Sequence, residues 1–338
     1  MRFTPTFSAL CLSAFAALAA PPVANATGGT PVYTVTVTSA PDIGKVVSAG
    51  SGVTVFTINP GNGIVTRTSG SGVRLTTSST RAAVSIKCGN YNACGSTYVE
   101  VIVGSIGSPT KRAGGLDNFT AAMNSATLAS GGDPAGTNPM GFGLNPIPQN
   151  TTKTFYLGFD YPIAGDNTAL PSGVAASGFY VYAAAYPNHA DTGTTSSAAA
   201  TVYRPISISN PTGLVFGKVV RPATGSGTVV INASTGVRST TGNATVLNTP
   251  TPSRAVYSVT GEGGQAVSVS VPTSFVMSTT GGTVTVTLTT TASGSQSLSS
   301  ALGSAGSFGF YVGGSLPVTP TTKDGNYTGT FTVTVQYN

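Results

Sequence analysis

The sequence predicts an all-β protein built from two tandem antiparallel β-sandwiches. Charged residues make up only 7% of the 338 residues, whereas Gly alone contributes 44. Helix surfaces are normally built from residues such as Glu, Lys and Leu, whereas strands with Thr and Val on alternate faces, joined by Gly-rich turns, suit this composition. Hydrophobic residues make up 40% of the chain, which is enough to fill two cores.

Strict alternation of apolar and hydroxyl side chains identifies the strands. In segments 33–38, 267–271 and 284–288, Tyr, Val or Leu alternates with Thr or Ser. A period of two is typical of half-buried antiparallel strands. Clusters of Gly, Pro and Asn separate such segments about every 8–12 residues, and this spacing favours a sandwich over a βαβ fold.

An internal repeat predicts the tandem organisation. Four anchors occur in the same order in both halves of the chain, and the first two are separated by the same interval in each copy. They are 42–47 with 215–220, 80–86 with 253–259, 155–163 with 310–318, and the pairs Gly178–Tyr186 and Gly329–Tyr337. We therefore predict a duplication.

The repeat sets the expected domain boundaries. We expect a first sandwich at 27–188, a linker at 189–200 and a second sandwich at 201–338, because 189–200 lacks large apolar residues. The first copy carries an insertion near 111–150. Within it, apolar residues with helical spacing predict a short helix. They are Leu116, Phe119, Met123 and Ala126.

Residues 1–26 have the features of a signal peptide. Arg2 precedes an apolar stretch from Phe7 to Ala20, and a small-x-small site follows, so we expect the mature chain to begin at Thr27. No later segment is long and apolar enough to span a bilayer as a helix. We expect an exported protein that passes through the periplasm to the cell surface or medium, without a transmembrane segment.

Cys88 and Cys94 are the two cysteines that remain after this cleavage. In an oxidising compartment such a pair is expected to form a disulfide. A zinc site would need two more ligands, and the single His, His189, lies far away in the sequence. We expect no metal and no cofactor.

The charged residues predict neither catalysis nor nucleic-acid binding. The nine Asp and Glu residues are widely spread, and His189 falls in the expected linker. Catalysis needs positioned acids, bases or nucleophiles, so we expect no enzyme. The 15 basic residues form no run longer than Lys111–Arg112, whereas nucleic-acid binding usually needs a clustered basic face.

The C-terminal segment is the most specific part of the sequence. Phe331, Val333, Val335 and Tyr337 lie on one face of an alternating strand, Tyr337 is penultimate, and Gly325 lies upstream. This pattern resembles the C-terminal signature of chaperone–usher pilus subunits. The second repeat, from about Thr201, also resembles a secreted bacterial pilin-like domain family of unknown function, and the first repeat resembles it more distantly.

The resemblance implies an incomplete immunoglobulin-like sandwich whose open groove takes a strand from a periplasmic chaperone, then from a neighbouring filament subunit. The partners it implies are a chaperone, an usher and other filament subunits. It makes Gly325, together with the four alternating residues of the last strand, strand-exchange or chaperone-facing positions. The alternative is that those four side chains form the inner face of the last core strand. Only Thr27 to Pro31 would precede the first strand, which favours a tip or minor subunit over a shaft subunit.

The insertion supplies a candidate binding loop for a surface glycan, because long loops on sandwiches often bind ligands. The alternative is a structural lid over a sheet edge. The leading functional hypothesis is a structural or adhesive subunit of a pilus-like filament. The alternative is a stand-alone secreted carbohydrate- or envelope-binding module. The loop candidates are Lys111, Arg112, Asp117, Asn118, Asp133 and Phe142.

Overall fold

The computed structural model describes residues 33–89, 92–186, 192–292 and 294–338. The predicted signal peptide and His189 lie outside these residues. Nearly all regular structure is β-strand, which confirms the predicted all-β sandwich class. Within the described ranges, no helix is long and apolar enough to cross a membrane.

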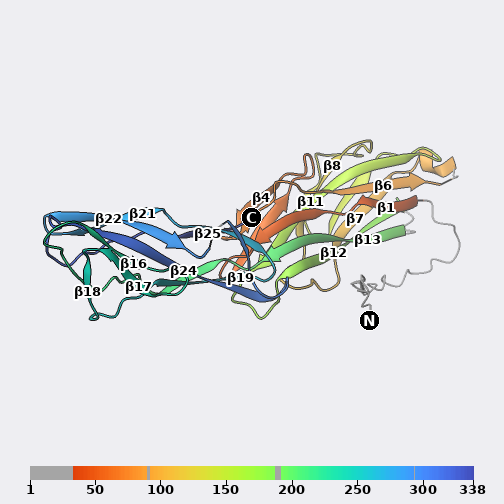
Figure 1. Cartoon of the computed structure of the whole chain (residues 1–338). Helices are drawn as coiled ribbons and strands as arrows, with labels where there is room; N and C mark the ends of the chain where they lie inside the picture. Colours follow the sequence, from red (N-terminus) through yellow and green to blue (C-terminus); the bar gives the residue numbers. More distant parts are fainter. Residues whose placement is uncertain (1–32, 90–91, 187–191, 293) are drawn as a thin grey trace, which may run out of the picture.

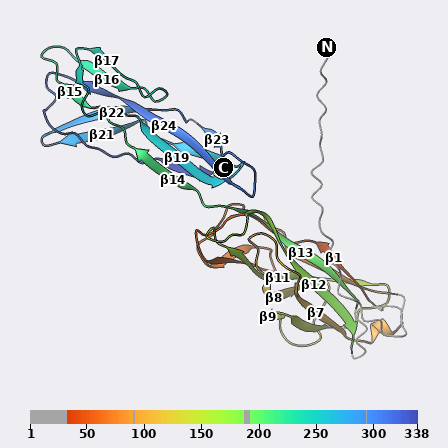
Figure 2. The same cartoon turned by 90° about the horizontal axis from the view of Figure 1, so that it is seen from below.

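Two elongated lobes lie end to end, and the C-terminus is close to the place where they meet (Figures 1 and 2). Each lobe has a hydrophobic core of its own. The first core is formed by residues between Tyr33 and Val202, and the second by residues between Phe216 and Val318. We call the lobes domain one, residues 33–203, and domain two, residues 204–338.

Domain one consists of two sheets that pack face to face around the first core. The strands of the first sheet are β1 (Tyr33–Ser39), β6 (Ala82–Cys88), β11 (Thr152–Ala164), β3 (Val53–Ile58) and β4 (Val65–Ser69), with β8 (Asp117–Met123) and β9 (Ala135–Thr137) added beside β11. Those of the second sheet are β10 (Met140–Leu144), β7 (Val99–Ile106), β12 (Gly173–Ala185), β13 (Thr192–Tyr203), β2 (Asp42–Val47) and β5 (Val73–Arg74).

The predicted short helix is wrong, because Phe119 and Met123 lie in strand β8, while Leu116 precedes it and Ala126 follows it. Phe119 and Ala121 are buried, and the strand pairs antiparallel with β11. The apolar residues of 116–126 fit a helical spacing, but Phe119, Ala121 and Met123 also alternate as in a strand. The segment forms a strand because it pairs with a free edge of β11.

The predicted linker is also wrong in its described part. Residues 192–203 form β13, which pairs antiparallel with β12 from Thr192 to Val202 and parallel with β2 at its other edge. Ala198, Ala200 and Val202 are buried. These small side chains make the segment look like a linker in sequence, yet they suit a strand that packs against large neighbours.

Domain two has the same kind of main sheet. Its strands are β14 (Ser207–Thr212), β19 (Ala255–Glu262), β24 (Ala305–Val318), β16 (Gly227–Ile231) and β17 (Arg238–Gly242), with β22 (Gly282–Thr290) and β21 (Ser274–Thr279) beside β24. The opposing layer is divided into the pair β15 (Lys218–Val220) and β18 (Thr245–Leu247) and the triplet β23 (Ser295–Ser297), β20 (Ala266–Ser270) and β25 (Thr334–Tyr337).

Matching contacts in the two domains support a duplication. The Arg81 guanidinium lies 3.4 Å from the centre of the Tyr156 ring and donates to the carbonyl oxygen of Pro60. In domain two, Arg254 stacks on a ring in the same way, also at 3.4 Å, and donates to a turn carbonyl at the equivalent place. The fourth sequence anchor is off by one residue, because the inward residues of the C-terminal segment match those of β12 when Tyr337 corresponds to Ala185.

Candidate functional site

A groove of about 710 Å³ runs along domain two. One wall is the segment 214–221, which includes β15, and the other is the segment 322–327. Met277, Val284 and Leu316 also line it, and all three are half-buried. It is therefore a largely apolar channel between a wall that includes β15 and a wall that is in no strand.

The groove lies where domain one holds β13. In domain one, β13 sits between β2 and β12. The repeat equates β2 with the segment 215–220, and the inward residues equate Gly173 at the start of β12 with Gly325. Among the described residues, β15 pairs only with β18, so it has no strand on its groove side, and the wall 322–327 is in no strand.

Without a neighbouring strand, the counterpart of β12 is shorter and the counterpart of β2 is less buried than in domain one. Strand β12 has 13 residues, whereas its counterpart β25 has four. Val46 of β2 is fully buried, but its counterpart Val219 is half-buried and Val220 is 45% exposed. Among the described residues, 14 partly buried apolar residues pack against the second core and five against the first, so domain two is the less completely closed sandwich.

The predicted strand-exchange residues have two different places. Phe331, Val333, Val335 and Tyr337 are half-buried against the second core, as expected for the inner face of a core strand. Gly325 instead lines the groove, and a side chain there would collide with Thr279. Sequence reasoning missed the opposite wall at 214–221, although the repeat contained the signal, since 192–203 has no counterpart in the second copy.

Tyr337 connects β25 with the point where domain two begins. Its hydroxyl donates to the Arg204 carbonyl oxygen over 2.8 Å and accepts from the Glu262 backbone N–H over 2.6 Å. The ring lies 5.4 Å from that of Tyr203. Burial raises the pKa of the Tyr337 hydroxyl to about 12, because the charged form would lose its water.

Replacing Tyr337 with Phe is expected to lower the free energy of unfolding by about 1–3 kcal/mol, because two backbone groups lose their partner. The raised pKa of Tyr337 makes the hydroxyl's contribution complete below pH 10, the ordinary value, and lost as the pH rises from 10 to about 12. Urea unfolding below and within this window measures both effects. Tyr327→Phe, which removes an exposed hydroxyl bond to Lys323, is the control. An equal alkaline loss in wild type and Tyr337→Phe would contradict the assignment.

A buried ionic group lies at the same junction and corrects the prediction for Arg112. The Arg112 side chain is fully buried, contacts the Asp166 carboxylate, and donates to Ser48 Oγ over 2.7 Å. Arg204 donates to the same carboxylate over 2.9 Å. Arg112 is therefore a structural residue, because its charge is held by Asp166 and is not available to a ligand.

The remaining loop candidates do not form one site. Asp133 lines a second groove of about 570 Å³ beside the β3–β4 turn. Asp117 and Asn118 begin β8, where the Asn118 amide donates to Asp160 over 3.2 Å. Phe142 packs edge-on against a core ring, with centroids 5.5 Å apart. Lys111 precedes Arg112 near the junction, so the predicted loop is split among four places.

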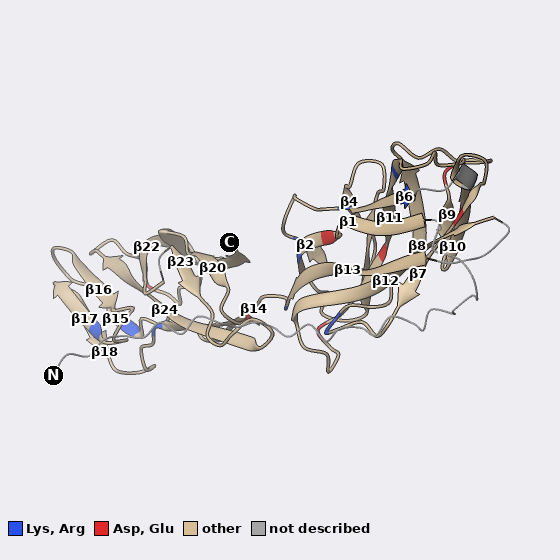
Figure 3. Cartoon of the chain, turned by 90° about the vertical axis from the view of Figure 1, so that its right-hand side faces the viewer, with Lys and Arg blue, Asp and Glu red and all other residues tan. Residues whose placement is uncertain are grey.

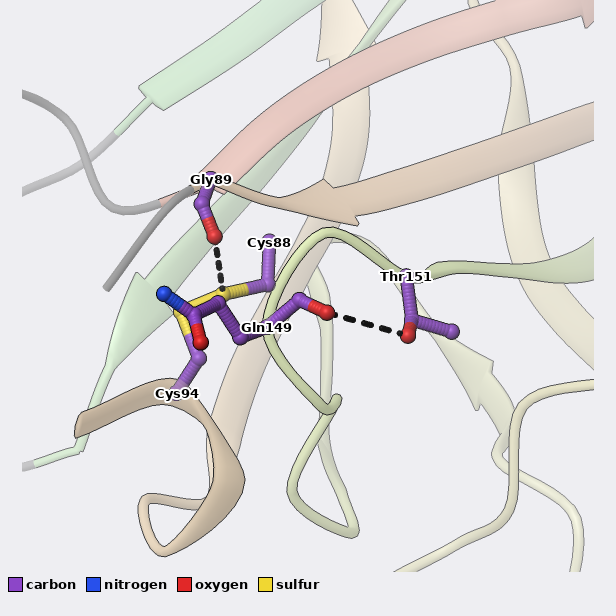
Figure 4. The surroundings of a disulfide bond; sticks show 5 residues. All are labelled: Cys88, Gly89, Cys94, Gln149 and Thr151. Atoms are coloured by element: carbon purple, nitrogen blue, oxygen red, sulfur yellow. Dashed lines mark hydrogen bonds between the residues drawn. A yellow bond between two sulfur atoms is a disulfide. The ribbon is translucent and has the colours of Figure 1, made fainter. Parts of the chain in front are cut away.

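The disulfide between Cys88 and Cys94 is confirmed (Figure 4). It ties the end of β6 to the short 3-10 helix η1 (Asn92–Gly95), and both cysteines are buried. Gln149 and Thr151 lie beside it, and the Cys88 backbone N–H donates to the Thr151 carbonyl oxygen over 3.1 Å. The bond therefore fixes the end of domain one that lies away from the junction.

Replacing both cysteines with Ala is expected to lower the free energy of unfolding by about 2.4 kcal/mol, because a seven-residue loop is no longer closed in the unfolded chain. Thermal unfolding of domain one measures the loss. Adding dithiothreitol to the wild type should reproduce it and should leave the double variant unchanged. A reductant effect on the double variant would contradict this explanation.

Charged residues are sparse along the strands (Figure 3). In the described part of the chain, no group of three or more His, Cys, Asp or Glu residues is placed to hold a metal ion.

Comparisons with known proteins match the second domain most specifically. A family model described as a domain of unknown function, DUF4402, matches residues 206–337. No curated protein matches the chain.

Two solved structures are similar over 90% of this chain, each at 10% identity. One comes from a study titled "Chaperone-tip adhesin complex is vital for synergistic activation of CFA/I fimbriae biogenesis", with 98% of that chain covered and a TM-score of 0.23. The other is a point mutant of the CFA/I adhesin CfaE of enterotoxigenic E. coli, with 94% covered and a TM-score of 0.25. Similarity at this level does not assign a function, which rests instead on the groove.

Proposed function

We propose that the protein is an exported, non-enzymatic subunit of a pilus-like surface filament, of the minor or tip type, whose second domain accepts a β-strand from another subunit. The groove between 214–221 and 322–327 carries this proposal, because domain one fills the equivalent place with β13. The match of residues 206–337 to a family without assigned function is compatible with it.

Strand addition explains what the groove offers. An added strand would pair with the open edge of β15, and its alternate side chains would enter the apolar channel. An exposed apolar edge of this kind promotes aggregation unless it is covered. The resemblance to chaperone–usher subunits implies a periplasmic chaperone before assembly, an usher during assembly and a filament neighbour afterwards as the partners, and an open groove is compatible with them.

Domain one supports a minor or tip role over that of a repeating shaft unit. Its groove is filled by its own β13, so it has no equivalent place to accept a strand. Strand β1 pairs with β6 along most of its length, so residues 33–39 belong to the sandwich and are not free to serve as a donor.

A self-complemented chain tests the proposal. Because Tyr337 corresponds to Ala185, a copy of residues 187–203 fused after Asn338 would reach the groove as β13 does in domain one. We expect the unfolding temperature of domain two to rise. The matched control carries Ala200→Asp in the fused copy only and should lose the gain. No rise with the unaltered copy or with copies that carry larger inward side chains would contradict the acceptor function.

The alternative function is stand-alone glycan binding by domain one. The second groove, with Asp133 and the polar side chains of Thr57 and Asn62, favours it. Asn62 Oδ1 already accepts the Ile64 backbone N–H, so part of this polar lining is engaged in the turn. A glycan array with wild type and Asp133→Ala decides: binding by the wild type that the variant loses supports the alternative, and no binding counts against it.

A further inference from the structure

We propose that the strand accepted by domain two is bulkier than β13 and carries an acidic residue at its C-terminal end. Large aliphatic side chains would stand where β13 has Ala198 and Ala200, and an acidic residue would stand where Arg204 follows β13. This inference rests on the proposed acceptor function and specifies the chemistry of the partner.

In domain one, large aromatic side chains fill the space beneath β13. Tyr161 is fully buried, and its hydroxyl donates to the carbonyl oxygens of Ala175 and Ala198, at 3.2 and 3.4 Å. Its pairing partner on β3 is Phe56, which is also buried. Above these large side chains, β13 carries Ala198 and Ala200 at two of its inward positions and Val202 at the third.

Domain two has smaller residues at the same register positions. The aligned motifs 155–163 and 310–318 equate Tyr161 with Leu316, whose pairing partner on β16 is Val229. At one position the residue is larger in domain two, since Phe216 corresponds to Ile43 of domain one. The groove nevertheless keeps about 710 Å³, and Leu316 is only half-buried where Tyr161 is covered completely.

Domain two also lacks a second aromatic side chain of domain one, but this difference does not enlarge the groove. Gly314 corresponds to Phe159, but a side chain at Gly314 would approach Val286 at 3.2 Å and Leu288 at 3.4 Å. Strand β22 therefore already fills that position. The unfilled volume is limited to the channel lined by Leu316, Met277 and Val284, beneath the path of the added strand.

The charge at the C-terminal end of this path is reversed between the domains. In domain one, β13 leads into Arg204, which pairs with Asp166 over 2.9 Å. In domain two, the same end of the groove has Arg221 and Lys323. The nearby Asp324 is 82% exposed and lies 3.8 Å from Arg221. Within the described ranges, Lys323 has no ion-pair partner, so an acidic residue on the incoming strand would complement this end.

Fusions after Asn338 test both features in the full chain. One carries a copy of residues 187–204, the second adds Ala198→Leu and Ala200→Leu in that copy, and the third adds Arg204→Glu to the second. We expect the unfolding temperature of domain two to rise in this order. The last increment should shrink in 1 M NaCl, since salt screens exposed charges.

Matched controls separate the possible causes. The same two Ala→Leu changes within β13 itself should lower the unfolding temperature of domain one, because that site is already filled. Synthetic peptides of residues 192–204 with the same substitutions, titrated by calorimetry, should bind in the same order and do not depend on folding of a fusion.

Each outcome has a distinct meaning. If no fused strand and no peptide acts on domain two, the acceptor function itself fails. If the unaltered copy stabilises domain two as much as the Leu variant, the inference on size is overturned while the acceptor function stands. If Glu at the end gives no more than Arg, the inference on charge is overturned.

Discussion

Replacing Ala200 with Asp is expected to unfold domain one or to lower its free energy of unfolding by about 3–5 kcal/mol, the cost of an uncompensated buried charge. Ala200 is 1% exposed and lies in β13, between β12 and β2. The Asp carboxylate would have no cationic partner there and would lose its water. Chemical unfolding followed by Tyr fluorescence measures the effect.

Thr195→Asp is the control for this prediction. Thr195 lies in the same strand and keeps the same pairing with β12, but its side chain is exposed. We expect its effect to stay within about 0.5 kcal/mol. If Ala200→Asp unfolds like wild type, residues 192–203 act as a linker and β13 is not part of the sandwich.

Replacing Asp166 with Ala is expected to cost about 3–5 kcal/mol, because the buried Arg112 guanidinium loses its carboxylate. Arg112 is fully buried, whereas the Asp166 side chain is 30% exposed. The loss should therefore come from Arg112 and not from Asp166 itself. Arg204, which also contacts Asp166, is 24% exposed and can be solvated in its place.

The double variant Arg112→Met with Asp166→Ala separates the charge from the packing. Replacing a buried ion pair with apolar side chains of similar size is often close to neutral, so the double variant should recover much of the stability. Urea unfolding of the wild type and the variants measures this. A double variant less stable than Asp166→Ala would show that the ion pair is not the cause.

Alternation and cysteine spacing predicted much of the fold because both depend on local sequence. Segments with a period of two, such as 284–288, became strands, and Cys88 and Cys94 formed their bond. Strand β13 could not be predicted in this way. Its inward residues are Ala, and their size is explained by Tyr161 on a strand that is distant in the sequence.

The candidate site was predictable only in part, for a related reason. The C-terminal pattern indicated an incomplete sandwich, and Gly325 does line the groove. The role of Arg112 depends on Asp166, which lies 54 residues later in the chain. No local sequence pattern indicates such an ion pair. A cation in an exposed binding loop and a buried cation therefore cannot be distinguished from the sequence.

Hydrogen exchange on the unmodified full chain tests most directly whether domain two lacks the strand that β13 supplies to domain one. Residues 173–178 of β12 pair with β13, and residues 325–330 are their counterparts. We expect slow exchange in the first segment and fast exchange in the second, apart from Thr328, whose backbone N–H donates to the Ser278 carbonyl oxygen over 3.0 Å. The second segment should slow once residues 187–203 are fused after Asn338. Equal protection of both segments without an added strand would contradict the account.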